Sequence, residues 1–337
     1  MGRYVVRRLL QFIPTVLGTL FLLHYLTSVA IQFGGNPVRS LFGDRTPPPE
    51  QLRQMTEQFG LGDPCLTRKG DWCIELFGQR LQNIFLHFDF GQSLSPRRDV
   101  TAVLADALPY TIKLTLIAFV VEAIIGLSAG TLAGLRNGKF SDYVVRIATV
   151  LMISVPIFVS AVLAQKFIGV KFGNWLRTDL GAPDWLGRGL FGAAYKPEYP
   201  FISLILPGIV LGTLTIASTA RLTRSSLLEN LRADYVRTAK AKGLKSTRVV
   251  GVHTLRNSLI PVVTTLGLSI GAYMSGAVVT EGVFRVPGVG FTIFRAIGQG
   301  EPMVLLGITT VLVLIYLVLN LLVDLLYAVL DPRIRYE

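Results

Sequence analysis

Long apolar segments, separated by polar loops, dominate the pattern of this chain. Six of them are long enough to cross a bilayer, because a transmembrane helix needs about 20 predominantly apolar residues. They cover residues 9–32, 110–133, 147–170, 201–219, 262–283 and 303–330. In lipid, each segment must be helical so that its backbone groups are hydrogen-bonded internally. The pattern therefore predicts an all-α integral membrane protein with six transmembrane helices, of which the last is long enough to tilt.

The first apolar segment follows basic residues and could also be read as a signal peptide. Residues 28–30, Ser-Val-Ala, resemble a cleavage site. However, the apolar run from Leu9 to Phe33 exceeds the roughly 7–15 residues of a signal-peptide core. This length favours a first transmembrane helix that is not cleaved.

Composition supports a membrane protein. Of the 337 residues, 51% are hydrophobic and only 16% are charged, whereas a soluble protein carries about a quarter charged residues. Much of the surface is therefore expected to face lipid.

The net charge of +12 arises from loops on one side of the predicted membrane. Basic residues accumulate in four segments: Arg3, Arg7 and Arg8; Arg136, Lys139 and Arg146; the loop 219–260; and Arg333 and Arg335. With six spans, all four segments fall on the same side. The opposite loops, 34–109 and 173–200, carry nearly equal numbers of acidic and basic residues. Because basic loops stay in the cytoplasm, both termini are predicted to be cytoplasmic, and the charge requires no nucleic acid.

The long outer loop contains both cysteines, Cys65 and Cys73. An extracytoplasmic compartment permits disulfides, so pairing of the two is plausible, and two free thiols are the alternative. With three histidines and no CxxC motif, no structural metal site is expected. The loop ends in residues 100–109, whose apolar positions recur at helical spacing and predict an amphipathic helix at the membrane interface.

Motifs for catalysis are weak. Residues 134–139, GLRNGK, lack the spacing and the final Ser/Thr of a P-loop, so the chain is not expected to hydrolyse ATP by itself. A GxSxG string at 126–130 places Ser128 inside a span, whereas a nucleophile elbow needs a strand-to-helix turn. Its two glycines also form a GxxxG step, which lets helices approach closely. Similar steps occur at Gly208/Gly212 and Gly267/Gly271. Packing is therefore favoured over an intramembrane serine hydrolase.

Three residues within the spans stand out. Glu122 is an ionisable residue deep in the second span, where such groups are costly. It either faces a polar pathway or pairs with a neighbour, and both interpretations stay open. Pro156 and Pro207 predict kinks in the third and fourth spans.

The cytoplasmic loop 219–260 contains a short predicted helix. Asp234 can cap its start, and Gly243 can end it as a left-handed C-cap. A second helical stretch, roughly 246–258, leads back to the membrane at Pro261. The result is a short helix tied at both ends to membrane spans, which can transmit a push from a cytoplasmic partner.

One face of this helix is apolar and the other is basic. Tyr235, Val236 and Ala239 recur at steps of three to four residues on the apolar face. From charge alone, an ordinary solvated basic loop that obeys the positive-inside rule would be the alternative.

This segment resembles the cytoplasmic EAA loop of ATP-binding-cassette (ABC) importer permeases, in the form found in the dipeptide/oligopeptide (peptide/nickel) family. Arg237, Thr238 and Ala239, followed after three residues by Gly243, occupy the positions of the motif. Arg237 and Thr238 replace its Glu and first Ala, and Pro261 lies further away than in sugar permeases. Both departures are typical of the peptide branch.

Other stretches carry the same resemblance along nearly the whole chain. They are residues 1–18, 89–94 (DFGQSL) and 281–290 (EGVFRVPGVG), whereas loop 34–88 is the least similar part. The chain most resembles the first, B-type, of the family's two permease subunits, which has the long first outer loop.

The resemblance implies a multi-pass permease of a bacterial or archaeal inner membrane that imports di- or oligopeptides, or a related small solute, by alternating access. Its implied partners are a second homologous permease, two cytoplasmic ATPase subunits that bind ATP and Mg²⁺, and an extracytoplasmic solute-binding protein. The chain itself then needs no cofactor and has no catalytic residues. A stand-alone secondary transporter remains the alternative, although no internal repeat is evident.

The resemblance also assigns candidate sites. Residues 1–109 form the first span and the outer loop, and 110–337 form the five-helix permease core. The residues assigned to ATPase coupling are Asp234, Tyr235, Arg237, Ala239 and Gly243. The residues assigned to an outer gate are Glu281, Pro287 and Gly290.

Overall fold

The computed structural model describes residues 2–42, 46–93, 97–299 and 301–330, and these are almost entirely helical. They form two compact units, each described separately below. Unit 1 consists of Thr111–Val286 with short segments from both ends of the chain, and unit 2 consists of Val6–Tyr110 and Pro287–Val318. Arg333 and Arg335, part of the predicted basic C-terminus, lie outside the described residues.

Unit 2 contains most of α1 and α13, the first turns of α4, and the short helices of the outer loop. The bounds are α1 Gly2–Gly34, η1 Pro37–Phe42, α2 Pro49–Gln58, η2 Pro64–Thr67, α3 Ile74–His87, α12 Val289–Gln299 and α13 Pro302–Leu330.

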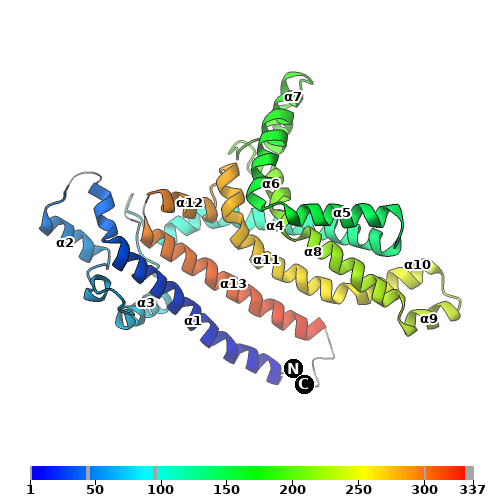
Figure 1. Cartoon of the computed structure of the whole chain (residues 1–337), viewed down its shortest axis with the longest axis horizontal. Helices are drawn as coiled ribbons and strands as arrows, with labels where there is room; N and C mark the ends of the chain where they lie inside the picture. Colours follow the sequence, from blue (N-terminus) through cyan, green and yellow to red (C-terminus); the bar gives the residue numbers. More distant parts are fainter. Residues whose placement is uncertain (1, 43–45, 94–96, 300, 331–337) are drawn as a thin grey trace. The chain divides into compact units, whose positions relative to one another are not determined.

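Unit 1 contains the rest of α4 and the helices that follow it in sequence (Figure 1). The bounds are α4 Val100–Leu135, α5 Phe140–Ser154, α6 Ile157–Leu163, η3 Ala164–Phe172, α7 Gly173–Thr178, η4 Trp185–Leu190, η5 Ile202–Leu204, α8 Ile205–Leu231, α9 Asp234–Ala241, α10 Ser246–Arg248, η6 Val249–Leu255 and α11 Arg256–Phe284.

Five helices of the described residues are long and apolar enough to cross a membrane, and a bent pair gives a sixth span if the pair crosses as one. The prediction of a helical membrane protein is thereby confirmed. The third span is not a single kinked helix, because α5 ends at Ser154 and the chain turns by 101° into α6. Pro156 lies at the break, where it cannot continue a helical hydrogen-bond ladder.

Two further expectations are corrected. Pro207 does not break the fourth span, because it lies in the first turn of α8, where its missing N–H costs no intrahelical bond. Residues 100–109 are not a separate helix, because they form the first turns of a continuous α4. The apolar side of those turns, with Val100, Leu104 and Ala107, is buried in unit 2.

Glycines let α4 and α8 pack closely in unit 1. A Cβ atom placed on Gly126 would lie 2.9 Å from Thr219 Cγ2, and one on Gly130 would lie 2.5 Å from the Ala220 carbonyl oxygen. Both glycines of the GxSxG string therefore face α8, whereas Ser128 between them is exposed in an unbroken helix. The packing interpretation of this string is confirmed.

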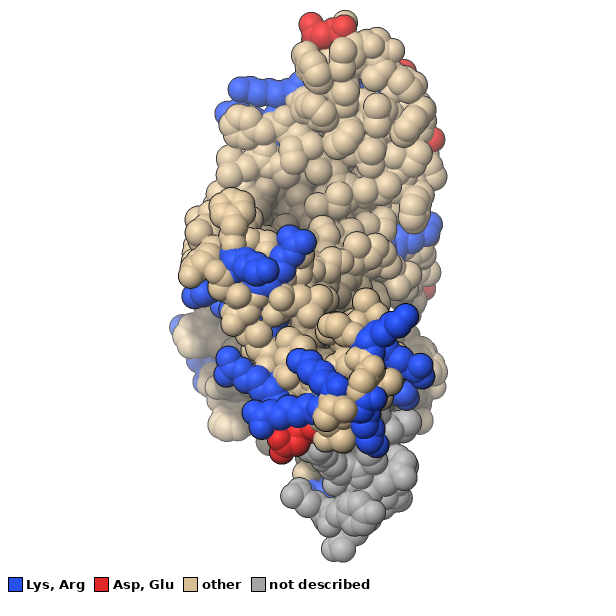
Figure 2. All heavy atoms as spheres, turned by 90° about the vertical axis from the view of Figure 1, so that its right-hand side faces the viewer, with Lys and Arg blue, Asp and Glu red and all other residues tan. Residues whose placement is uncertain are grey.

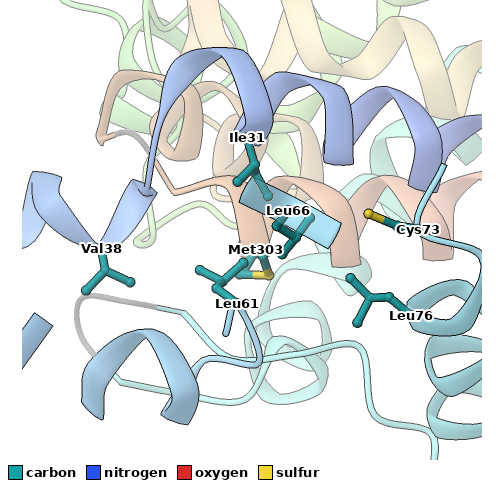
Figure 3. Packing of buried hydrophobic residues seen from close by; sticks show 7 residues of the cluster. All are labelled: Ile31, Val38, Leu61, Leu66, Cys73, Leu76 and Met303. Atoms are coloured by element: carbon teal, nitrogen blue, oxygen red, sulfur yellow. The ribbon is translucent and has the colours of Figure 1, made fainter. Parts of the chain in front are cut away.

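Unit 2 has its own apolar cluster at the end of α1. Ile31, Val38, Leu61, Leu66, Cys73, Leu76 and Met303 are buried together (Figure 3). Beside this cluster, Cys65 and Cys73 are joined by a disulfide with a Cα–Cα distance of 5.4 Å. Gln32 of α1 donates to the Asp71 carbonyl oxygen (2.9 Å) and accepts from Gly70 N–H (2.9 Å), which ties the disulfide loop to the first span.

Removing the disulfide should destabilise unit 2 without disturbing unit 1. Replacing Cys65 and Cys73 by serine opens a loop of sequence separation 8, and closing a loop of this size stabilises a fold by about 2–3 kcal/mol. Thermal unfolding of the purified double variant, followed by intrinsic tryptophan fluorescence, should show an earlier transition. An equally early transition in wild type under non-reducing conditions would contradict the expectation.

Candidate functional site: the coupling segment and the contacts that hold it

The coupling segment, residues 234–243, begins with helix α9. The residue before it, Ala233, has extended backbone angles (φ −68°, ψ 150°) and serves as the N-cap. Asp234 is thus the first helical residue and not the cap, which corrects the sequence prediction. Its carboxylate is exposed and lies 3.4 Å from the Arg237 guanidinium. A negative charge in the first turn still favours the helix through the helix dipole.

Gly243 ends the helix in the predicted left-handed conformation, with φ +75°. Its N–H donates to the Lys240 carbonyl oxygen (3.0 Å), and Leu244 N–H donates to the Ala239 carbonyl oxygen (3.3 Å). This pair of bonds is a Schellman motif, which satisfies the last carbonyl groups of a helix. A residue with a Cβ atom would be strained here, so the sharp end of α9 depends on glycine.

The inner face of α9 packs against the segment that follows it. Val236 is fully buried and Ala239 is 7% exposed, and both contact Val249, with Leu244 beside them. Ala239 therefore packs against residues of its own chain. Its assignment to ATPase contact stays a prediction, but a bulky variant there would break the local cluster before it could report on docking.

The outer face of the coupling segment is basic. Tyr235, which the periodicity placed on the apolar face with Val236, is instead 39% exposed, and Arg237 is exposed beside it. Across residues 232–248 the exposed basic residues are Arg232, Arg237, Lys240, Lys242, Lys245 and Arg248, with Asp234 as the single acidic residue. Figure 2 shows Lys and Arg side chains gathered on this face of the molecule, with few Asp or Glu among them. The surface can accept an acidic groove.

Two helices of unit 1 hold the coupling segment at its ends. Helix α8 precedes it and α11 follows through α10 and η6, and α8 and α11 pack along each other (Figure 1). Near the segment, Ser226 Oγ of α8 donates to the Ser258 carbonyl oxygen of α11 (2.9 Å), and both side chains are buried. Helix α9 is thus connected to both helices, and its role in transmitting a displacement stays a prediction.

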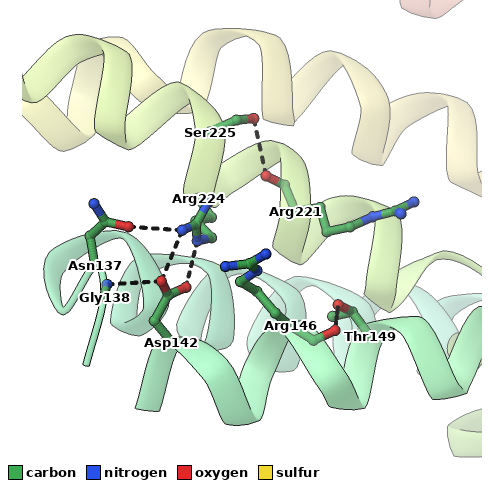
Figure 4. A network of polar contacts seen from close by, with 8 residues as sticks. All are labelled: Asn137, Gly138, Asp142, Arg146, Thr149, Arg221, Arg224 and Ser225. Carbon is green, nitrogen blue, oxygen red and sulfur yellow. Dashed lines mark hydrogen bonds and ion pairs between the residues drawn. The ribbon is translucent and has the colours of Figure 1, made fainter. Parts of the chain in front are cut away.

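A buried ion pair connects α8 to α5. Arg224 Nε and Nη2 donate to the two oxygens of Asp142 at 2.6 and 2.9 Å, and Nη2 also donates to Asn137 Oδ1 at 2.8 Å (Figure 4). The Asp142 side chain is 1% exposed, and Gly138 N–H adds a further bond to it. This two-bond geometry is the strong form of an arginine–carboxylate contact. It fastens the turn between α4 and α5 to the helix that leads into the coupling segment.

Glu122 of α4 is fully buried among hydroxyl groups of α8 and α11. Thr219 and Ser269 donate to its Oε1 (2.5 and 2.9 Å), and Tyr273 donates to its Oε2 (2.7 Å). Three donors explain how a carboxyl group can be accommodated at this depth. The geometry fits pairing with neighbours, and a position for Glu122 along a pathway stays a prediction.

The three expected outer-gate residues fall in different units. Glu281 is fully buried near the end of α11 in unit 1, where Thr111 Oγ1 donates to it at 2.7 Å. Pro287 and Gly290 belong to unit 2, at the start of α12. Pro287 lines a cavity of about 600 Å³ with residues of α12 and the first turns of α4. Each residue is placed only within its own unit, so a common outer gate stays a prediction.

Among residues 2–42, 46–93, 97–299 and 301–330, no three His, Cys, Asp or Glu side chains come together as metal ligands would. Ser128 lies exposed on α4 and on the side away from the α8 contact.

Two polar contacts were not foreseen from the sequence. Asp142 is the one acidic residue in the basic stretch 136–146, which was a usable signal. His24 is a polar residue inside an apolar span, and its ring accepts a hydrogen bond from Arg80. In both cases the partner lies far along the chain, and no local pattern identifies it.

Comparison with known proteins identifies the family of this chain. The sequence profile of the family described as "binding-protein-dependent transport system inner membrane component" matches residues 126–336, which include the coupling segment. The chain belongs to this family. The matched region covers every unit 1 helix from α5 to α11 and also α12 and α13.

Several curated members of the family resemble the chain over its full length. The di/tripeptide transport system permease protein DppB of Pseudomonas aeruginosa is 37% identical over 99% of both chains. The dipeptide transport system permease protein DppB of Alkalihalophilus pseudofirmus is 34% identical over 99% of both chains. A solved structure of an amino acid ABC transporter is 14% identical, with a TM-score of 0.48, and the match covers 69% of this chain and 94% of that one.

Family membership decides between the alternatives left by the sequence. The chain is a multi-pass membrane permease of the ABC-importer type, and its relatives are transport subunits. Neither a stand-alone secondary transporter nor an intramembrane serine hydrolase is favoured.

Proposed function

We propose that this chain is one of two permease subunits of an importer for short peptides, driven by two separate ATPase subunits. The peptide specificity is supported by the names of its full-length relatives. ATP and Mg²⁺ are bound by the ATPases, and this chain has no nucleotide site of its own. An extracytoplasmic binding protein delivers the peptide.

The observation that carries this proposal is the form of the coupling segment. The inner face of α9 packs against Val249, and the helix ends at Gly243. On its outer face, Tyr235 and Arg237 are exposed to solvent. A short rigid helix with a free basic face, continuous on both sides with membrane helices, suits force transfer from a partner. Asp234, Tyr235 and Arg237 contact the ATPase, whereas Ala239 and Gly243 shape the helix.

The orientation follows from charge. The basic coupling segment lies in the cytoplasm with both termini, in the inner membrane of a bacterium or archaeon. Residues 1–109 then supply the first span and the outer loop that meets the binding protein, and residues 110–337 form the core that lines the pathway. Glu281, Pro287 and Gly290 are assigned to an outer gate.

The test is ATP-driven uptake by the complete transporter reconstituted in liposomes with its binding protein. Wild type should accumulate radiolabelled dialanine only when ATP is present on the ATPase side. Arg237→Glu should lower both uptake and peptide-stimulated ATP hydrolysis at least about tenfold, because like-charge contact at a docking surface costs several kcal/mol.

Arg188→Glu provides a matched control. It introduces the same charge change at an exposed arginine of η4, far along the chain from the coupling segment. This variant should keep wild-type uptake. Unchanged uptake in Arg237→Glu would refute the docking assignment, and no ATP-dependent accumulation in wild type would refute the proposed function.

A further inference from the structure

Unit 2 contains a partly open cavity that the transport mechanism described above does not use. It has a volume of about 370 Å³, within the range of small-molecule sites. Its walls come from α1, α3, the segment 89–92 and the beginning of α13. Leu76 and Met303, both part of the cluster in Figure 3, form apolar wall, together with Phe77.

His24 and Arg80 meet at this cavity. Arg80 Nη1 lies 3.1 Å from His24 Nδ1, and His24 Nε2 lies 3.1 Å from the Cys73 carbonyl oxygen. A guanidinium can only donate, so Nδ1 must accept, and the proton of a neutral His24 then sits on Nε2 and is donated to Cys73. The histidine is buried. It therefore acts as a neutral support that orients the guanidinium.

Arg80 is left with unused donors. Among residues 2–42, 46–93, 97–299 and 301–330, no carboxylate lies within ion-pair distance of it. Burial lowers the pKa of Arg80 to about 10, so the group remains cationic at neutral pH. A half-buried guanidinium with one neutral acceptor and four further N–H groups suits a carboxylate or phosphate ligand.

The cavity also contains a carboxylate. Asp89 lines it, and one of its oxygens accepts a bond from Gly91 N–H at 2.8 Å. A second cation, Arg97, also lines the cavity, where it lies over the Phe59 ring and donates to Gln92. The lining of the cavity thus includes cationic, anionic and apolar side chains. A zwitterion with small apolar side chains is the complement of this arrangement.

We propose that this cavity binds a short zwitterionic peptide, with the peptide carboxylate on Arg80 and its ammonium group at Asp89. The inference rests on the proposed function and extends it, because it places a peptide site in the outer loop unit of the permease itself. Arg80 is the specificity-determining residue for a free C-terminal carboxylate. A lipid phosphate offers the same oxyanion chemistry. Phosphatidylglycerol, however, has no ammonium group that could pair with the Asp89 carboxylate.

The experiment measures binding of dialanine to the purified permease–ATPase complex in nanodiscs, without binding protein and without ATP, by isothermal titration. Arg80→Gln should weaken dialanine binding about 10- to 100-fold, the factor expected for a lost hydrogen bond to a charged group. Arg53→Gln is the matched control, because Arg53 is an exposed arginine of the same unit on α2. It should bind dialanine like wild type.

A second probe separates a direct contact from a structural effect. Dialanine amide lacks the carboxylate, so wild type should bind it as weakly as Arg80→Gln binds dialanine, and the variant should not distinguish the two probes. If Arg80→Gln instead weakens the binding of dialanine and of dialanine amide by the same factor, Arg80 has a structural role only and the assignment is overturned.

Two other results would also overturn it. One is equal dialanine affinity in wild type and Arg80→Gln. The other is a phosphatidylglycerol that co-purifies with wild type, is absent from Arg80→Gln, and prevents dialanine from binding to wild type. If ATP-driven uptake is present while either result is found, this inference fails and the proposed function stands. If uptake itself is absent, the proposed function fails.

Discussion

Replacing Arg224 with methionine should lower the free energy of unfolding by about 3–5 kcal/mol, because it leaves a buried carboxylate without its counter-charge. Asp142 is 1% exposed and receives two bonds from this guanidinium. The thermal unfolding temperature of the purified protein measures the loss. The same variant should also uncouple ATP hydrolysis from uptake, since it frees α5 from the helix that leads into the coupling segment.

The double variant Asp142→Asn/Arg224→Met provides the control. It removes the Asp142 charge that Arg224→Met leaves unpaired. It should therefore unfold at a temperature closer to wild type than Arg224→Met does. If the single and double variants are equally destabilised, the loss comes from packing of the arginine side chain and the ion pair contributes little. An unfolding temperature of Arg224→Met equal to wild type would refute the role of the pair altogether.

Gly130→Leu should prevent α4 from packing on α8. Even the first side-chain atom would lie 2.5 Å from the Ala220 carbonyl oxygen and 2.6 Å from Thr223 Cβ. Neither neighbour can move without shifting α8, so the expected cost is about 3 kcal/mol or more. That is a large part of the total stability of a folded domain. Size-exclusion chromatography after purification should show little monodisperse protein.

Ser128→Leu is the matched control for this prediction. It adds a leucine two residues away on the same helix, at a position that is exposed and does not face α8. It should yield wild-type amounts of monodisperse protein and normal uptake, which would also exclude a catalytic role for Ser128. Equal yields of Gly130→Leu and wild type would show that α4 and α8 do not approach as closely as described.

The coupling segment shows how far a local pattern reaches. Its helical character and its glycine end could be predicted, because a C-cap depends only on adjacent residues and on the conformational freedom of Gly243. The predicted N-cap, Asp234, was wrong by one residue, because Ala233 already has the extended backbone of an N-cap. Ala239 faces inward because it packs on Val249, and the periodicity of the helix does not identify that contact.

Five of the six predicted spans and the helical class were determined by the sequence by itself. Lipid forces every backbone group to be satisfied within its own segment, so apolar length is sufficient to predict a helix. The tertiary structure decided the rest. The size of the turn after Ser154, 101°, is one example, because a proline in the sequence marks a break but not its angle. The contacts of Arg224 with Asp142 and of Arg80 with His24 join residues 82 and 56 positions apart. Such pairs depend on how helices pack in three dimensions. The residues next to each partner in the sequence therefore do not predict them.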